Sequence, residues 1–175
     1  AASDVYKRQG GGQQYGIRSG TQPVALACGF AAALRACVDE FDTMTARWQS
    51  WRERVMAWCR QQPEVTVDDA PVTSPSIIHL SIAGARGTDV VMLADRDGVD
   101  LSAGSACHAG VSRPSPTMLA MGKDEDAASS GVRISMGYTT TDADIDRLLA
   151  ALPAAIHKAS AVSYTHLTLP TKRIV

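Results

Sequence analysis

Apolar residues recur every three or four positions from Leu26 to Trp58, which is the pattern of a helix with one apolar face. The positions concerned are Leu26, Phe30, Leu34, Cys37, Phe41, Met44, Trp48, Trp51, Val55 and Trp58. Unbroken, such a helix would span roughly 50 Å at about 1.5 Å per residue, which is more than the width of a small domain. We therefore predict one long helix over residues 24–62 that links two bodies, with Pro63 at its end.

The three tryptophans of this helix are predicted to pack against other residues rather than to bind a ligand. Half of the apolar face would lack a partner in a chain of this length, so part of it should contact solvent. We expect partial exposure of Trp48, Trp51 and Trp58.

Beyond Pro63 the pattern changes to short alternating runs and shorter helices. Strands are predicted at residues 65–67, 76–82, 99–102 and 131–137, and helices at residues 88–95, 115–121 and from 141 onward. Thr141 and Asp144 form a capping-box pattern at the start of the last helix, and the polar residues 124–130 are predicted as a surface turn. The order of these elements predicts an α/β protein, a mixed α+β small domain over residues 63–161 with helices on one face of a small sheet.

The two ends of the chain differ from the rest. Residues 1–9 and 162–175 have no periodicity and resemble translated sequencing-adaptor read-through, so we expect both segments to be non-native. His166 and Tyr164 are for this reason left out of any functional interpretation.

Composition argues against nucleic acid and membrane partners. Charged residues make up 20% of the chain, its net charge is -1, and its isoelectric point is near 6.5. The most apolar run, residues 24–34, is shorter than the roughly 20 residues that a membrane-spanning helix needs. Cys28, Cys37 and Cys59 lie on or near the apolar face of the long helix and are predicted to be structural. The cysteines and histidines are not spaced like metal ligands. Reduced thiols in the cytoplasm are therefore the simplest expectation.

A glycine-rich loop precedes the long helix. Residues 10–21 read GGGQQYGIRSGT, and Pro23 suits the first position of a helix. The positive end of a helix dipole favours phosphate, so Ser19 and Thr21 are candidate phosphate contacts, with Arg18 nearby. The alternative is that the loop only turns the chain.

A second candidate is Cys107, which lies in the run DLSAGSACHAGVSRPSP over residues 100–116. Small residues on both sides and two prolines after it predict an accessible loop, where a thiol can act as a nucleophile. The alternative is that Cys107 lies in a loop and has no functional role. His79, on the less apolar face of its strand, is predicted to be a hydrogen-bonded, half-buried histidine rather than a catalytic one.

Three segments resemble the C-terminal part of the pyridoxal-phosphate-dependent cysteine desulfurases of the class V aminotransferase superfamily. They are GGGQQYGIRSGT followed by a helix, SAGSACHAG followed by PSPTMLAMG, and GVRISMGYTTTDADID. They occur in the family's order between about Gly10 and Ala159. The resemblance implies the C-terminal domain of a fold-type I enzyme, with residues 10–23 as the end of a preceding large domain.

The resemblance also implies roles for three residues. Cys107 matches the catalytic cysteine that takes sulfur from L-cysteine as a persulfide, leaves L-alanine, and passes the sulfur to an acceptor or scaffold protein. Arg133 matches the arginine that binds the substrate carboxylate. Thr21 matches the threonine that contacts the phosphate of pyridoxal 5'-phosphate in the neighbouring subunit, which implies a homodimer. His108 follows Cys107 directly, and we expect its side chain to face solvent.

The sequence also departs from the family. Gln14 replaces a common acidic residue, and Gln22 and Pro23 replace a common Glu-Asn pair. The family's Schiff-base lysine has no counterpart, since Lys7, Lys123, Lys158 and Lys172 lie in no matching motif. We therefore expect this chain to be inactive alone and to be part of a longer desulfurase. The alternatives are a selenocysteine lyase, another enzyme of the class V aminotransferase type, or a cofactor-free sulfur-relay module.

Overall fold

The computed structural model describes residues 10–104 and 114–168, with side chains described as far as residue 161. The chain divides into two compact units, residues 1–42 and 43–175. Cys107 and His108 lie outside the described residues, as do most of the two terminal segments that the sequence predicts to be non-native. That prediction remains a prediction, and helix α6 ends within the second of these segments, at Thr168.

The described part of the first unit begins with the glycine-rich loop, which leads into a helix. The loop includes a short 3-10 turn, η1 (Gln13–Gly16), in which Gln14 and Tyr15 have positive φ values. Helix α1 (Val24–Asp39) follows, and none of its residues is buried. Cys28 and Cys37 are exposed on it, so the prediction that they are packed structural residues is wrong for this chain.

The predicted long helix is in fact two helices. Helix α1 ends at Asp39, and α2 (Phe41–Cys59) begins after Glu40, whose ψ of -2° departs from the helical value. Acidic residues surround this break. Asp39 and Glu40 lie at the negative end of the α1 dipole, where carboxylates are unfavourable, whereas Asp42 lies in the first turn of α2, where a carboxylate is favourable. Asp42 therefore favours the start of a helix here, which the apolar periodicity does not predict, whereas Asp39 and Glu40 do not favour the end of one.

The second unit is built on a four-stranded antiparallel sheet with the order β1-β2-β4-β3. Its strands are β1 (Val65–Val67), β2 (Ile77–Ile82), β3 (Ser102–Ala103) and β4 (Gly131–Ser135). The alternation in β2 and β4 confirms two predicted strands. Pairing of Ile78 with Ile134 and of Leu80 with Val132 places the apolar side chains of both strands on one face.

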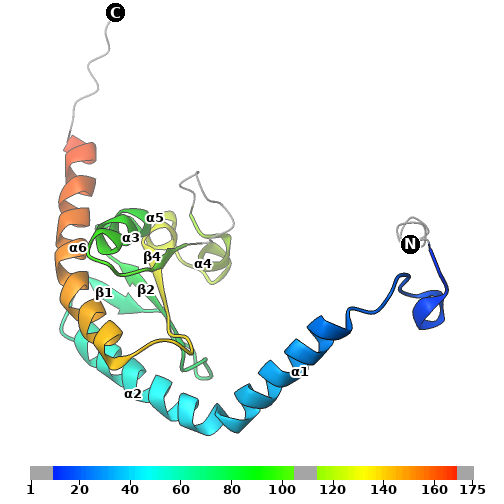
Figure 1. Ribbon diagram of the computed structural model, residues 1–175. Coiled ribbons are helices and arrows are strands. Elements are labelled where there is room, and N and C mark those ends of the chain that lie inside the picture. The colour runs from blue at the N-terminus through cyan, green and yellow to red at the C-terminus, as the bar shows by residue number, and fades with distance from the viewer. Residues whose placement is uncertain (1–9, 105–113, 169–175) are drawn as a thin grey trace, which may run out of the picture. The chain divides into compact units, whose positions relative to one another are not determined.

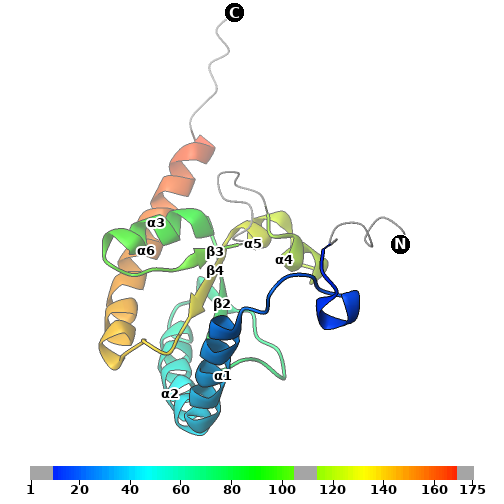
Figure 2. The ribbon, with the colours of Figure 1, turned by 45° about the vertical axis from the view of Figure 1, so that its right-hand side comes forward.

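Helices α2, α3 (Gly87–Arg96) and α6 (Asp142–Thr168) cover that apolar face and form the core with it. Figure 2 shows α3 and α6 to one side of the strands and α4 (Pro116–Ala120) and α5 (Glu125–Ser129) to the other. The small sheet with helices over its apolar face confirms the predicted fold class (Figure 1). The polar segment 124–130 is not a turn, because α5 forms there with Asp124 as its N-cap.

One of the three tryptophans is more deeply buried than predicted. Trp51 is only 1% exposed, so the expectation that it is partly exposed is wrong, whereas Trp48 and Trp58 are indeed partly buried. Cys59 is buried in the core, as expected. The predicted capping box also forms, since Asp144 accepts hydrogen bonds from the backbone and hydroxyl of Thr141 and donates its own N–H to that hydroxyl.

Candidate functional site

The face of the sheet opposite the core carries a row of polar residues. The N–H of Asp68 donates a hydrogen bond to the carbonyl of His79 in β2. This bond extends the β1–β2 pairing by one residue and makes Asp68 the cross-strand partner of His79. His79 pairs in turn with Arg133, and Arg133 pairs with Ser102 on β3. Cross-strand partners share a face. The side chains Asp68, His79, Arg133 and Ser102 therefore form one line across all four strands, which we call the polar row.

Arg133 has unused hydrogen-bonding capacity. Its Nη2 lies 3.4 Å from the Oγ of Ser102, which is a long hydrogen bond, and its Nε is buried with no partner among the described residues. A buried donor without a partner is costly, and a guanidinium binds a carboxylate through two parallel N–H donors. The geometry therefore suits Arg133 to an external anion of carboxylate shape.

Asp68 is in the opposite condition, because three side chains contact it. Oδ2 accepts hydrogen bonds from the Oγ of Ser81 at 2.6 Å and from Nδ1 of His79 at 2.8 Å, while Oδ1 lies 2.6 Å from the Nζ of Lys123. Burial tends to raise the pKa of this carboxyl group, but the hydrogen bonds from Lys123, Ser81 and His79 outweigh burial and hold the pKa below its ordinary value. Asp68 is thus an ionised carboxylate, 3% exposed, whose Oδ2 accepts two hydrogen bonds and whose Oδ1 is paired with the Lys123 ammonium.

His79 is hydrogen-bonded and half-buried, as the sequence predicts. Its side chain is 22% exposed, and its ring lies over Gly131, where an added Cβ would come within 2.9 Å of Cε1. Asp68 and Lys123 were not predicted as part of any site. Thr66 and Asp68 alternate with apolar residues along β1, and this pattern could have placed Asp68 on the polar face of the sheet. No local sequence signal indicates that Lys123 contacts Asp68.

The described residues on both sides of Cys107 are anchored by backbone hydrogen bonds. Gly104, which follows β3 with a φ of +51°, donates its N–H to the carbonyl of Gly131 at 3.1 Å. At the other end, Ser115 caps α4 and its N–H bonds the carbonyl of Ala128 in α5 at 2.9 Å. The strand that leads toward Cys107 is therefore the immediate neighbour of Arg133.

Thr21 belongs to the first unit and is exposed. The Nη1 of Arg18 donates to the carbonyls of Gly20 and Thr21, at 3.0 and 3.1 Å, and Ser19 bonds the carbonyl of Gly11. These contacts hold the glycine-rich loop in shape and leave the Thr21 side chain at the surface. Arg18 and Ser19 act on this loop's own backbone.

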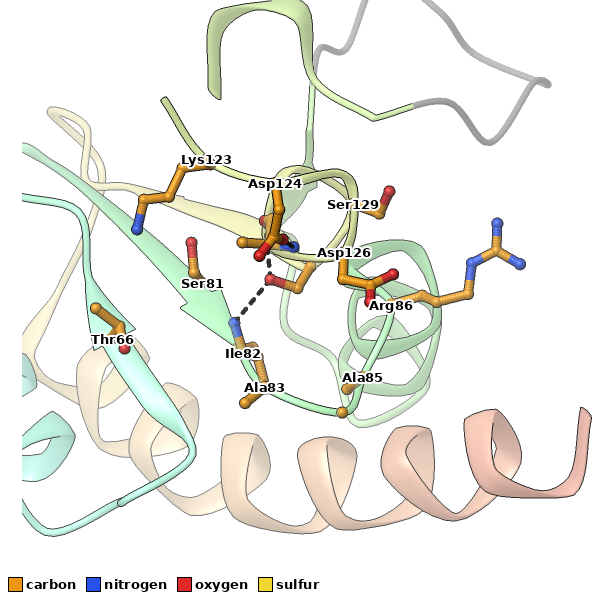
Figure 3. Close-up of a pocket in the computed structure, with 13 residues that line it drawn as sticks. Thr66, Ser81, Ile82, Ala83, Ala85, Arg86, Lys123, Asp124, Asp126 and Ser129 are labelled. Atoms are coloured by element: carbon orange, nitrogen blue, oxygen red, sulfur yellow. Dashed lines mark hydrogen bonds between the residues drawn. The ribbon is translucent and has the colours of Figure 1, made fainter. Parts of the chain in front are cut away.

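A cavity of about 870 Å³ opens beside the sheet, between the end of β2 and α5 (Figure 3). Lys123 and Ser81 line one part of it, and Asp126 and Arg86 line another. The hydroxyl of Ser130 accepts a hydrogen bond from the N–H of Ile82 at 3.2 Å, which ties α5 to the sheet. Lys123 therefore belongs both to this cavity and to the contacts of Asp68, whereas Arg133 does not line the cavity.

Residues 3–148 match the family described as aminotransferase class V. The chain belongs to this family. Among curated relatives of this class V chain, the IscS-like cysteine desulfurase of Mycobacterium tuberculosis is 38% identical over 153 residues, and the match covers 86% of this chain and 39% of that protein. Cysteine desulfurase IscS of Salmonella typhi is 34% identical over 138 residues, which cover 78% of this chain and 34% of that protein.

Solved structures agree with the class V assignment at the level of the fold. The NifS-like protein from Rickettsia africae superposes with a TM-score of 0.72 at 24% identity, over 85% of this chain and 39% of that one. The chain thus spans about two fifths of the length of the Mycobacterium tuberculosis and Rickettsia africae proteins. Within the described residues no group of His, Cys, Asp and Glu could hold a metal ion, and no helix there is long and apolar enough to cross a membrane.

Proposed function

We propose that this chain is the C-terminal portion of a cysteine desulfurase, an enzyme that converts L-cysteine to L-alanine and passes the sulfur to an acceptor protein. Membership of the class V aminotransferase family and the likeness to proteins named cysteine desulfurases support this proposal. The single observation that carries it is Arg133, a guanidinium whose buried Nε has no partner in the described part of the chain and which lies beside the strand that leads to Cys107.

Arg133 would bind the carboxylate of the substrate. It lies in β4, a strand with neighbours on both sides, so its backbone is held more rigidly than a loop residue would be. The long bond to Ser102 orients the guanidinium without saturating it. Two parallel hydrogen bonds from the guanidinium to a carboxylate would satisfy the donors that the described residues leave unpaired.

Cys107 would act as the nucleophile. Its thiolate attacks the sulfur of the bound L-cysteine, the carbon–sulfur bond breaks, and the sulfur stays on Cys107 as a persulfide. The carbon skeleton takes up a proton and leaves as L-alanine. When bound, pyridoxal 5'-phosphate withdraws electrons from the substrate carbons and makes this cleavage feasible. The persulfide then passes its outer sulfur to a thiol of the acceptor.

The described residues fit one contact to that cofactor. The exposed hydroxyl of Thr21 is available to a phosphate, and we infer that it contacts the cofactor of a neighbouring subunit in a homodimer. Lys123 is engaged with Asp68, which fits its lack of a family counterpart. The Schiff-base lysine would come from the part of the longer relatives that this chain does not match, so the chain alone would be inactive.

A selenocysteine lyase is the main competing enzyme, because an arginine and a thiol suit either amino acid. A cofactor-free sulfur-relay module is the other alternative, and it would not need Arg133. For the desulfurase we propose a cytoplasmic location, where thiols stay reduced.

A chimaera tests the proposal. The matching segment of the Mycobacterium tuberculosis relative is replaced by residues 10–161 of this chain, and alanine and sulfide are measured with L-cysteine and with L-selenocysteine. We expect turnover of L-cysteine that Cys107→Ser abolishes and that Arg133→Gln impairs through a raised KM. A folded chimaera that binds the cofactor and turns over neither substrate would refute the proposal, while turnover of L-selenocysteine alone would support the lyase.

A further inference from the structure

Asp68 and Arg133 carry opposite charges in the same polar row, yet no ion pair joins them among the described contacts. Only His79 separates them. Two strand spacings of about 4.8 Å place their backbones about 10 Å apart, which a long arginine and a carboxylate can bridge together. A pair of this kind would consume the guanidinium. The row therefore contains a competitor for the donors of Arg133.

Lys123 neutralises that competitor from above the sheet. It lies in the connection between the short helices α4 and α5. Its backbone N–H donates a hydrogen bond of 3.0 Å to the carbonyl of Met118 in α4, which holds it in place. Its ammonium group meets Oδ1 of Asp68 at 2.6 Å, with 31% of the lysine side chain exposed. Because the two charges lie this close together and are partly shielded from solvent, the ammonium cancels most of the electric field that Asp68 would otherwise exert on Arg133.

His79 blocks the remaining approach. It occupies the position between Asp68 and Arg133, and its Nδ1 is bonded to the oxygen of Asp68 that Ser81 also contacts. On the far side of Arg133, Ser102 accepts a hydrogen bond from Nη2. Asp68 is thus held on one side of His79, and the guanidinium is drawn toward β3 on the other.

We propose that Lys123 and His79 are positioning residues that sequester Asp68 and so keep Arg133 available for a carboxylate from outside the chain. This inference deepens the proposed function, on which it rests, because it assigns a role to the side chains that surround the proposed carboxylate-binding arginine. The charged groups in this arrangement are Asp68 from the extended β1, Lys123 from the α4–α5 connection and Arg133 from β4, with His79 of β2 between them.

Competition predicts a specific pattern of rescue. Lys123→Met keeps the length of the side chain but removes the ammonium, so Asp68 becomes an uncompensated carboxylate and attracts Arg133. Adding Asp68→Asn to that variant removes the competitor and frees Arg133 again. A residue that only stabilised the fold would not show this recovery, because the second substitution removes further contacts.

The test uses the 175-residue chain labelled with nitrogen-15, in which the Nε–H signal of Arg133 is identified by its absence in Arg133→Gln. Sodium acetate, a simple carboxylate, is titrated against sodium chloride at matched ionic strength. We expect a saturable acetate shift in the parent chain, an acetate affinity about tenfold weaker in Lys123→Met, and recovery to within about twofold of the parent in Asp68→Asn/Lys123→Met. Lys158→Met, an exposed lysine of α6, is the matched control and should titrate like the parent.

Each other outcome has a definite meaning. If the parent signal does not respond to acetate, Arg133 is not a carboxylate site, and both the proposed function and this inference lose their support. If the parent responds and Lys123→Met responds equally, the desulfurase proposal stands and sequestration is wrong. If Lys123→Met is weak and Asp68→Asn fails to restore it, the role of Lys123 is structural and the inference is overturned.

Discussion

The indole Nε1 of Trp51, in α2, donates a hydrogen bond of 2.7 Å to Oδ1 of Asp142, the first residue of α6. The two residues are 91 positions apart in the sequence, and the tryptophan is 1% exposed. Trp51→Phe keeps the ring in the core but removes the donor to a charged acceptor. We expect the free energy of unfolding to fall by about 1–3 kcal/mol in urea denaturation.

Trp48→Phe is the matched control for this change. Its Nε1 is buried without a hydrogen-bond partner among the described residues, so removal of this donor should cost little beyond the loss of ring area. Equal losses in the two variants would mean that the bond to Asp142 contributes nothing measurable.

Asp68 should make the stability of the second unit depend on acid. The pKa of its carboxyl is lowered in the folded chain, against the effect of burial, by hydrogen bonds from Lys123, Ser81 and His79. A group with a lowered folded pKa contributes stability above its unfolded pKa of about 3.9, and that contribution disappears as the pH falls through the folded value. Asp68→Asn should therefore be less stable than the parent near neutral pH, and the difference should shrink below about pH 3.9.

Urea denaturation at a series of pH values measures this difference. Asp95→Asn, an exposed residue of α3, serves as the control for the loss of one carboxylate. A gap between parent and Asp68→Asn that stays constant from neutral to acid pH would contradict the predicted linkage.

Gly87, at the start of α3, has no room for a side chain. A Cβ there would lie 2.2 Å from the carbonyl oxygen of Gly131, a backbone atom of β4 that cannot rotate away. Gly87→Ala should therefore push α3 from the sheet and cost about 1–3 kcal/mol or more in thermal or urea unfolding. Gly137→Ala, where nothing lies within 4 Å of the added atom, should change stability by less than about 0.5 kcal/mol.

The cysteines should differ in reactivity. Burial raises the pKa of the Cys59 thiol to about 11, although a hydrogen bond from its own backbone and the charge of Arg60 act in the other direction. Cys28 and Cys37 are exposed on α1. Iodoacetamide at pH 8, followed by mass spectrometry of peptides, should modify Cys28 and Cys37 within minutes and leave Cys59 unmodified until the chain unfolds. Early labelling of Cys59 would show that α2 leaves the core readily.

Sequence periodicity predicted the elements that bury one apolar face, because burial imposes that periodicity. The alternation in residues 77–82 and 131–135 and the apolar positions of α2 and α6 are of this kind. It failed where another force decides. The break at Glu40 interrupts an apolar periodicity that continues through it, and α5 depends on an Asp124 cap in a segment whose polar composition favours a turn.

The candidate site was less accessible to prediction. Arg133 could be placed on a strand from its alternation and from the family resemblance. Its neighbours could not, since the pairing of residue 68 with 79, of 79 with 133 and of 133 with 102 depends on strand order and register across four separate segments. Lys123 reaches Asp68 only because two short helices turn the chain back over the sheet.

The strand order also affects how copies of this chain behave toward one another. The two outer strands, β1 and β3, have three and two residues, while the longer strands β2 and β4, each apolar on one face, lie between them. Short outer strands offer few unpaired backbone groups to a second chain, and long apolar strands are the ones that promote amyloid-like association when they are exposed. The folded second unit should therefore resist aggregation by edge-to-edge strand addition, and partial unfolding that frees β2 should be the step that starts it.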